Sequence, residues 1–128
     1  MDHAFEPPRT ILVVEDEPDV LLIMRSLLRE LTSGYEITTV GSGFDALALV
    51  QKGGIALVLT DYNMPGLNGL ELLRRIKSVS PATKVIMVTA FAGADLERKA
   101  RAAGASAFLP KPFGLDELIG AMQRALSN

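Results

Sequence analysis

Several side chains that suit phosphoryl transfer come at the ends of apolar runs in this sequence. Glu15, Asp16 and Asp61 are carboxylates that end or directly follow such runs, Thr89 ends another run, and Lys111 follows a weaker one. A carboxylate can attack phosphorus and form an aspartyl phosphate. The protein then has mainly to position the groups and neutralise charge. This set offers a nucleophile, two further acids, a hydroxyl and a cation.

The three carboxylates also predict a metal site. Carboxylates held close together repel one another, and burial raises their pKa values. Mg²⁺ resolves this conflict because it prefers oxygen ligands, including carboxylates, waters and phosphate. We expect Asp16 and Asp61 to bind it directly, Glu15 to act directly or through water, and the backbone carbonyl of Asn63 to supply another oxygen. Mg²⁺ and Lys111 would then neutralise the phosphoryl oxygens, and the Thr89 hydroxyl would donate a hydrogen bond to the new phosphate.

The elements that must position these residues alternate along the chain. Short apolar runs predict strands over 11–14, 36–40, 55–60 and 84–89, with a weaker strand over 105–109. Helical periodicity predicts helices from Pro18 to a stop at Gly34, from Phe44 to Val50, from an N-cap at Asn68 to before Pro81, over 95–103 with Gly104 as C-cap, and from Leu115 to Leu126.

Strands alternating with helices predict an α/β fold with a parallel sheet between two helical layers, a three-layer αβα sandwich. Pro110 lacks the N–H that a central ladder needs, so the fifth strand belongs at an edge. The flavodoxin-like strand order 2-1-3-4-5 satisfies this condition. In such a sheet the carboxyl ends of all strands share one rim, which would bring the reactive side chains together.

Length and composition restrict the classes of function. The chain has 128 residues, 48% hydrophobic and 22% charged, which predicts one globular domain over 10–127 after a flexible N-terminal lead over 1–9. A net charge of −2 argues against a dedicated nucleic-acid surface. With no cysteine and His3 as the single histidine, thiolate and Ser-His-Asp mechanisms are excluded. No run approaches the ~18 apolar residues of a membrane span.

Each residue also has a plain structural explanation. Residues 15–17 could form a solvated turn that favours a helix N-terminus. Asp61 could be a turn former, Thr89 a cap and Lys111 a surface lysine. The joint placement of these residues at several predicted strand ends favours a site.

Four motifs resemble the receiver domain of two-component response regulators over about residues 10–127. They are Ile11–Pro18, Leu59–Gly66, Val88–Ala90 and Lys111–Phe113. The resemblance implies that a histidine kinase or histidine phosphotransfer protein phosphorylates Asp61, with Glu15 and Asp16 as the acid pair that holds Mg²⁺.

The resemblance also implies a switch. Thr89 matches the switch hydroxyl, Lys111 the phosphate-binding lysine and Phe108 the switch aromatic, which swings inward when Thr89 moves toward the phosphate. The surface of the fourth helix, fifth strand and fifth helix then changes and controls a downstream protein target or output domain. Ordinary core packing is the alternative for Phe108, and Tyr62 and Phe91 either gate the site or pack on its loops.

The resemblance further implies a cytoplasmic signalling switch whose own chemistry is limited to gaining and losing the phosphoryl group, with no direct contact to nucleic acid or membrane. Phosphorylation-dependent homodimers and attachment to a larger regulator stay open. Two features depart from the family pattern. The acid pair is Glu-Asp where Asp-Asp is also common, and Leu109-Pro110 stiffens the strand before Lys111.

Other functions fit less well. A haloacid-dehalogenase-type phosphatase needs a second acid two residues after the nucleophile, where this chain has Asn63. A flavodoxin-like FMN binder would want glycine and hydroxyl groups where residues 15–19 are acidic. A scaffold that never takes phosphate would not need the complete set of site residues.

Overall fold

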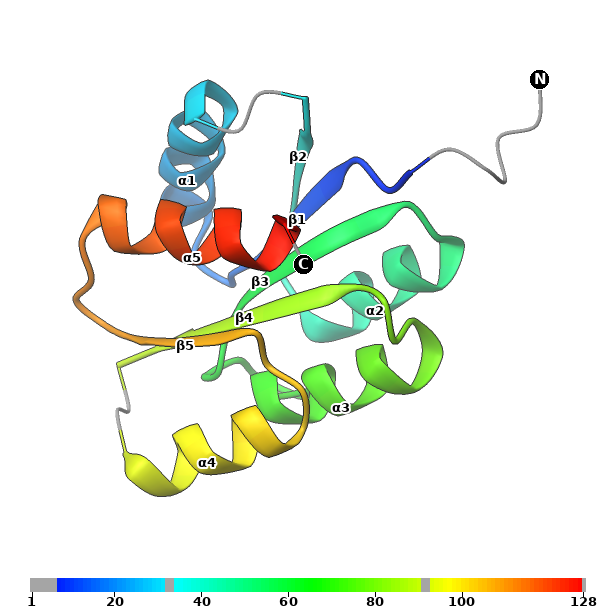
Figure 1. The fold of residues 1–128 in the computed structure, drawn as a ribbon, viewed down its shortest axis with the longest axis vertical. Helices are drawn as coiled ribbons and strands as arrows, with labels where there is room; N and C mark the ends of the chain where they lie inside the picture. The colour runs from blue at the N-terminus through cyan, green and yellow to red at the C-terminus, as the bar shows by residue number, and fades with distance from the viewer. Residues whose placement is uncertain (1–6, 32–33, 91–92, 128) are drawn as a thin grey trace.

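The computed structural model describes residues 7–31, 34–90 and 93–127. Five helices and five strands alternate within them: β1 Thr10–Val14, α1 Pro18–Leu31, β2 Glu36–Val40, α2 Gly43–Lys52, β3 Ile55–Asp61, α3 Gly69–Val79, β4 Lys84–Thr89, α4 Ala94–Ala102, β5 Ala107–Pro110 and α5 Leu115–Ser127. The strands form one parallel sheet in the order β2-β1-β3-β4-β5, so the predicted fold and order are confirmed (Figure 1). Of the predicted lead, residues 1–6 lie outside the described part, and 7–9 have no regular structure.

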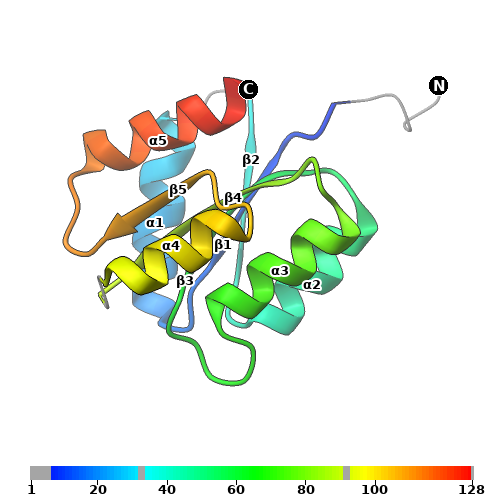
Figure 2. The ribbon, with the colours of Figure 1, turned by 60° about the horizontal axis from the view of Figure 1, so that its bottom comes forward.

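Helices cover both faces of the sheet. Helices α1 and α5 lie on one face, and α2, α3 and α4 lie on the other (Figures 1 and 2). Each face has its own apolar core, which explains why the central strands are apolar at almost every position. None of the helices in the described part is long and apolar enough to cross a bilayer.

Strand β1 shows how one apolar run serves both cores. Leu12 and Val14 pack with α2, α3 and α4, whereas Ile11 and Val13 pack with α1 and α5. All four side chains are at most 1% exposed. Burial of a side chain of this size contributes about 1.5–3 kcal/mol, so the strand is held firmly from both sides. This fixes the position of the residues that follow it.

The helix ends are set by local polar groups. The Asn68 side chain accepts a hydrogen bond from the Glu71 N–H at 2.9 Å, as predicted for an N-cap, and Ser42 caps α2 in the same way. The prediction for Gly104 was off by one residue. Ala103 is the C-cap of α4, and Gly104 follows it with φ +107°, a conformation that glycine adopts without steric cost.

Candidate functional site

Asp61 lies at the carboxyl end of the central strand β3, where it is 9% exposed. Both oxygens of its carboxylate have partners. The Asn63 N–H donates to Oδ1 at 3.0 Å, and the Lys111 ammonium donates to Oδ2 at 2.7 Å. Hydrogen bonds with an ionised donor and acceptor are short and strong. The carboxylate is therefore held in one orientation at the rim of the sheet.

Lys111 reaches Asp61 from the end of β5, across β4. Pro110 pairs with Thr89 in the sheet but has no N–H, and the Thr89 carbonyl accepts a hydrogen bond from the Lys111 N–H at 2.7 Å. The next peptide bond, Lys111–Pro112, is cis. Burial alone would lower the pKa of Lys111, but its hydrogen bond and ion pair with Asp61 outweigh this and raise the pKa above 10.5.

Glu15 joins this pair from the end of β1. It is 6% exposed, and its Oε1 lies 3.7 Å from the Lys111 ammonium. Its Oε2 accepts a hydrogen bond from the Asp16 N–H at 2.9 Å. Burial raises the pKa of Glu15 above its usual value, and the nearby Asp16 side chain raises it further. The structure therefore brings Glu15, Asp61 and Lys111 together, as the shared rim predicted.

Asp16 is placed differently from Glu15. Its side chain is exposed, and it lies close enough to Glu15 to raise the pKa of that carboxyl. Within the described ranges, no three acidic, histidine or cysteine side chains form a group ready to hold a metal ion. The chemistry of the donors nevertheless fits Mg²⁺, because Glu15, Asp16, Asp61 and the Asn63 carbonyl offer only hard oxygens. Burial is the main cause of the raised pKa of Glu15, and the nearby Asp16 and Asp61 side chains add to it, so a cation beside these acids would stabilise the charged form of Glu15.

Thr89 and Phe108, the two predicted switch residues, are both buried. Thr89 is fully buried at the end of β4, one residue beyond Val88, which pairs with Asp61. Phe108 is 5% exposed and packs in the core between the sheet and α2, α3 and α4. This burial fits the core-packing alternative for Phe108, and its role as a switch residue stays a prediction.

Two further residues were expected to flank the site. The half-buried Tyr62 packs against the core under α2, α3 and α4, and its N–H donates to the Val88 carbonyl at 3.0 Å. This favours the packing alternative for Tyr62. Phe91 lies outside the described residues.

Gly69, at the start of α3, is a site residue that sequence reasoning missed. Its N–H donates to the Tyr62 carbonyl at 2.8 Å. A Cβ atom at this position would clash with the Asp61 carbonyl oxygen and would lie 2.7 Å from the Tyr62 Cα. The backbone of α3 thus approaches the end of β3 so closely that only glycine fits. The signal in the sequence is a glycine directly after the predicted N-cap Asn68, to which we assigned no role.

A cavity of about 620 Å³ opens beside the charged groups. Asp61, Glu15 and Lys111 line one part of it. The remaining described lining is apolar and comes mainly from the two helices on that face, the neighbouring strands and the segment after β5: Val13, Val14, Met24, Leu59, Val88, Ala90, Pro112, Phe113, Leu115 and Leu118. Apolar surroundings strengthen the interaction between Asp61 and Lys111 because they lower the local dielectric constant.

The arrangement can support transfer of a charged group to Asp61. A carboxylate nucleophile, a cation in contact with it and an adjacent acid pair meet at one rim. A buried hydroxyl-bearing residue, Thr89, ends the neighbouring strand. Among the described residues at this rim there is no histidine or cysteine, and Asp61 is the carboxylate that is hydrogen-bonded to the Lys111 ammonium.

Comparison with known proteins agrees with this geometry. The chain matches the response regulator receiver domain family over residues 11–123. It is 36% identical over 118 residues to the transcriptional regulatory protein ZraR of Salmonella typhimurium, an alignment that covers 92% of this chain and 26% of that protein. The chain thus spans about a quarter of the length of ZraR.

Two further proteins align with this chain over nearly the whole length of both sequences. The sporulation initiation phosphotransferase F of Bacillus subtilis is 31% identical over 116 residues, which are 91% of this chain and 92% of that protein. The crystal structure of a response regulator receiver domain protein from Clostridium thermocellum has a TM-score of 0.85 and 32% identity, and covers 93% of this chain and 94% of that one.

Proposed function

This chain belongs to the response regulator receiver domain family of two-component systems, and we propose that Asp61 is its phosphoacceptor. Receiver domains are signalling switches, and gain or loss of one phosphoryl group is the chemistry that the site supports. The observation that carries the proposal is the 2.7 Å contact between the Asp61 carboxylate and the Lys111 ammonium. These residues are fifty positions apart, and two different strand ends bring them together.

The side chains of the site would divide the work of transfer. A carboxylate oxygen of Asp61 forms a bond to phosphorus while the bond from phosphorus to the donor's leaving atom breaks, and the leaving atom keeps the electron pair. The Asn63 N–H holds one carboxylate oxygen in place. The Lys111 ammonium, already at the carboxylate, would face the incoming phosphoryl oxygens and neutralise part of their charge.

Glu15, Asp16, Asp61 and the backbone carbonyl of Asn63 would hold Mg²⁺. When bound, Mg²⁺ supplies further neutralisation of the phosphoryl group. Within this set Glu15 is the buried member and Asp16 the exposed one. Glu15, with Oε1 3.7 Å from the Lys111 ammonium, would also attract this ammonium toward the site, whereas the exposed Asp16 side chain would turn toward an ion that arrives from solvent.

We further propose that Thr89 and Phe108 transmit the phosphorylation state. Thr89 ends the strand between β3 and β5, and its carbonyl is tied to the Lys111 N–H. A shift of Thr89 or Lys111 toward a phosphate would therefore pull on the end of β5 and change the surface of α4, β5 and α5. Such a local charge event that biases a two-state element is the general form of a phosphorylation switch.

The partners follow from this role. The donor would be a histidine kinase or histidine phosphotransfer protein in the cytoplasm. The phosphorylation signal would pass to a downstream protein or to an output domain. Self-association of phosphorylated chains is a further way to transmit this signal. Since ZraR is about four times as long as the aligned segment, an output domain in the same polypeptide is one such arrangement.

Intact-mass spectrometry tests the proposal. After incubation with acetyl phosphate and Mg²⁺, we expect the wild-type mass to rise by one phosphoryl group, and we expect no rise with excess EDTA. The Asp61→Asn variant should stay unmodified, whereas Asp45→Asn, a change of an exposed acid on α2, should be modified normally. Modification that persists in Asp61→Asn would refute the assignment.

A further inference from the structure

The first turn of α2 packs against the loop that follows Asp61. This loop joins β3 to α3 over residues 62–68. Helices α2 and α3 lie side by side on the same face of the sheet (Figures 1 and 2). Gly43 is buried, and a Cβ atom at this position would lie 3.1 Å from the Cβ and Cδ2 atoms of Leu67. The backbone of α2 therefore approaches the loop very closely.

Phe44, the next residue of α2, covers the preceding residue of the loop. A Cβ atom added to Gly66 would lie 3.3 Å from Phe44 Cε2 and 4.0 Å from Cδ2, so the ring lies where a side chain of residue 66 would point. Phe44 is nevertheless 57% exposed, so it adds little to the apolar core. Its contact with the loop is what this aromatic ring provides.

The middle of this loop depends on packing of this kind. Backbone hydrogen bonds hold the two ends of the loop, at Tyr62 and Asn68. Among the described residues, no backbone-to-backbone hydrogen bond involves residues 64–67. Gly66 is exposed, has φ +79° and has no side chain that could anchor it in the core. The Phe44 ring therefore restrains the loop at a point that its own hydrogen bonds leave open.

A displacement at this point reaches the phosphorylation site through Asn63. Asn63 lies three residues before Gly66, and its N–H donates to Asp61 Oδ1 at 3.0 Å. Pro65 stands between them. Its ring fixes its own φ and also restricts the backbone of Met64 before it. This short segment therefore has few ways to absorb movement, so a shift of Gly66 is passed to the residue that holds the reactive carboxylate.

We propose that Phe44 is a positioning residue for phosphorylation: its ring holds Gly66 in place, and through this loop it keeps the Asn63 backbone at the Asp61 carboxylate. The inference rests on the proposed function, in which Asn63 offers its N–H to the nucleophile and its carbonyl oxygen to Mg²⁺. The restraint itself is an apolar contact between groups already in place. Leucine at position 44 would keep most of this contact, whereas alanine would lose it.

The first test measures how fast the Asn63 amide proton exchanges with water, by NMR of ¹⁵N-labelled, unphosphorylated protein in EDTA. A looser loop breaks the hydrogen bond to Asp61 more often. We expect exchange in Phe44→Ala to be about three- to fivefold faster than in wild type. This factor corresponds to ~0.7–1 kcal/mol, the share of a phenylalanine's burial that a ring 57% exposed can contribute. Phe44→Leu should restore most of the protection.

The second test measures the rate of phosphorylation by acetyl phosphate at saturating Mg²⁺, with intact mass as the readout. We expect Phe44→Ala to react about twofold or more slowly than wild type, because the Asp61 carboxylate is correctly oriented for a smaller fraction of the time. Phe44→Leu should react at close to the wild-type rate.

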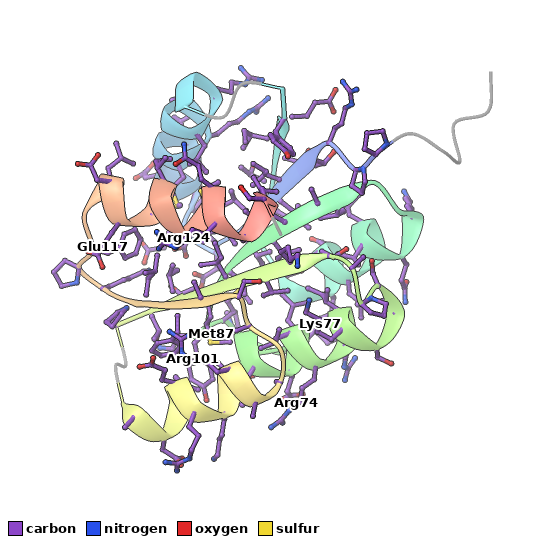
Figure 3. All side chains as sticks on the ribbon, viewed as in Figure 1. Arg74, Lys77, Met87, Arg101, Glu117 and Arg124 are labelled. Carbon is purple, nitrogen blue, oxygen red and sulfur yellow. The ribbon has the colours of Figure 1, made fainter. Side chains whose placement is uncertain are left out.

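Val79→Ala is the matched control, because it also shortens an exposed apolar side chain. Val79 is 50% exposed and is the last residue of α3, about 15 Å along the helix from Gly69. Arg74→Ala, which removes an exposed side chain from the same helix, is a second control (Figure 3). Both variants should keep the wild-type exchange of the Asn63 amide and the wild-type rate of phosphorylation.

Two results would overturn the inference: Asn63 exchange in Phe44→Ala that equals exchange in Val79→Ala, or exchange in Phe44→Leu as fast as in Phe44→Ala. The exchange measurement needs neither phosphate nor metal, so it separates this inference from the proposed function. Faster exchange in Phe44→Ala without phosphorylation of Asp61 in wild type would support the restraint of the loop and remove only the assignment of the phosphoacceptor. Phosphorylation of wild-type Asp61 with unchanged exchange in Phe44→Ala would remove only the role of Phe44.

Discussion

Replacement of Gly69 by alanine tests the packing that positions the reactive carboxylate. The added methyl group would clash with the Asp61 carbonyl oxygen and would lie 2.7 Å from the Tyr62 Cα and 3.1 Å from the Asp61 carbonyl carbon. All three atoms belong to backbone, which cannot rotate away as the end of a side chain can. The end of β3 and the start of α3 must therefore move apart, and Asp61 must move with them.

The size of the effect follows from two opposing contributions. Overpacking of a filled region costs about 1–3 kcal/mol. Alanine in place of glycine returns about 0.4–1 kcal/mol because the unfolded chain has fewer conformations to lose. We therefore expect Gly69→Ala to lower the free energy of unfolding by about 1–2 kcal/mol, and the melting temperature by about 3–8 °C for a chain of this size.

Urea unfolding of Gly69→Ala beside Gly41→Ala gives the measurement. Gly41 is exposed, has no positive φ, and an added Cβ would meet only the Glu15 carbonyl oxygen at an ordinary 3.8 Å. This control includes the unfolded-state effect and lacks the clash. We also expect slower phosphorylation by acetyl phosphate in Gly69→Ala than in Gly41→Ala. Equal stability and equal rates for the two variants would refute the close approach of α3 to β3.

The remaining predictions concern charge and capping. Because the pKa of Lys111 is raised in the folded state, its stabilising contribution is fully present below pH 10.5 and is lost as pH rises through the raised value. In urea unfolding, the difference in stability between wild type and Lys111→Met should therefore stay constant up to about pH 10 and shrink above it. A difference that grows above about pH 10 would contradict this sign. The melting temperature should rise with increasing Mg²⁺ concentration. In a thermal-shift assay, Asp16→Asn should abolish this rise and the control Glu17→Gln should keep it. An unchanged response in Asp16→Asn would show that Asp16 is not part of the metal site. Asn68→Ala should lower the free energy of unfolding in urea by about 1 kcal/mol, because the Glu71 N–H loses its cap. Ser78→Ala, at an exposed position of the same helix, should lower it by less than half as much. Equal losses in the two variants would argue against the cap.

Sequence patterns predicted the fold because local signals and topology agreed. Short apolar runs marked the strands, and Pro110 placed β5 at the edge that it occupies. The parallel sheet then required the ends of β1, β3 and β5 to meet, which is why Glu15, Asp61 and Lys111 come together. This prediction rested on the rule that the carboxyl ends of parallel strands lie at the same edge of a sheet.

Other features depended on tertiary packing and could not be predicted in the same way. Glu15 and Asp16 are adjacent acids, and no residue pattern predicts that one is buried and the other exposed. The requirement for Gly69 arises from two backbone segments that approach in space. Neither of these relations has a periodic signal along the chain.

The most direct test of the central claim is to locate the phosphoryl group. Protein treated with acetyl phosphate and Mg²⁺ can be reduced with borohydride, which converts a phosphorylated aspartate to homoserine and leaves a mass change that survives proteolysis and peptide sequencing by mass spectrometry. We predict this change at Asp61 alone. The same change at Asp16, Glu15 or another carboxylate, with Asp61 unmodified, would contradict the account.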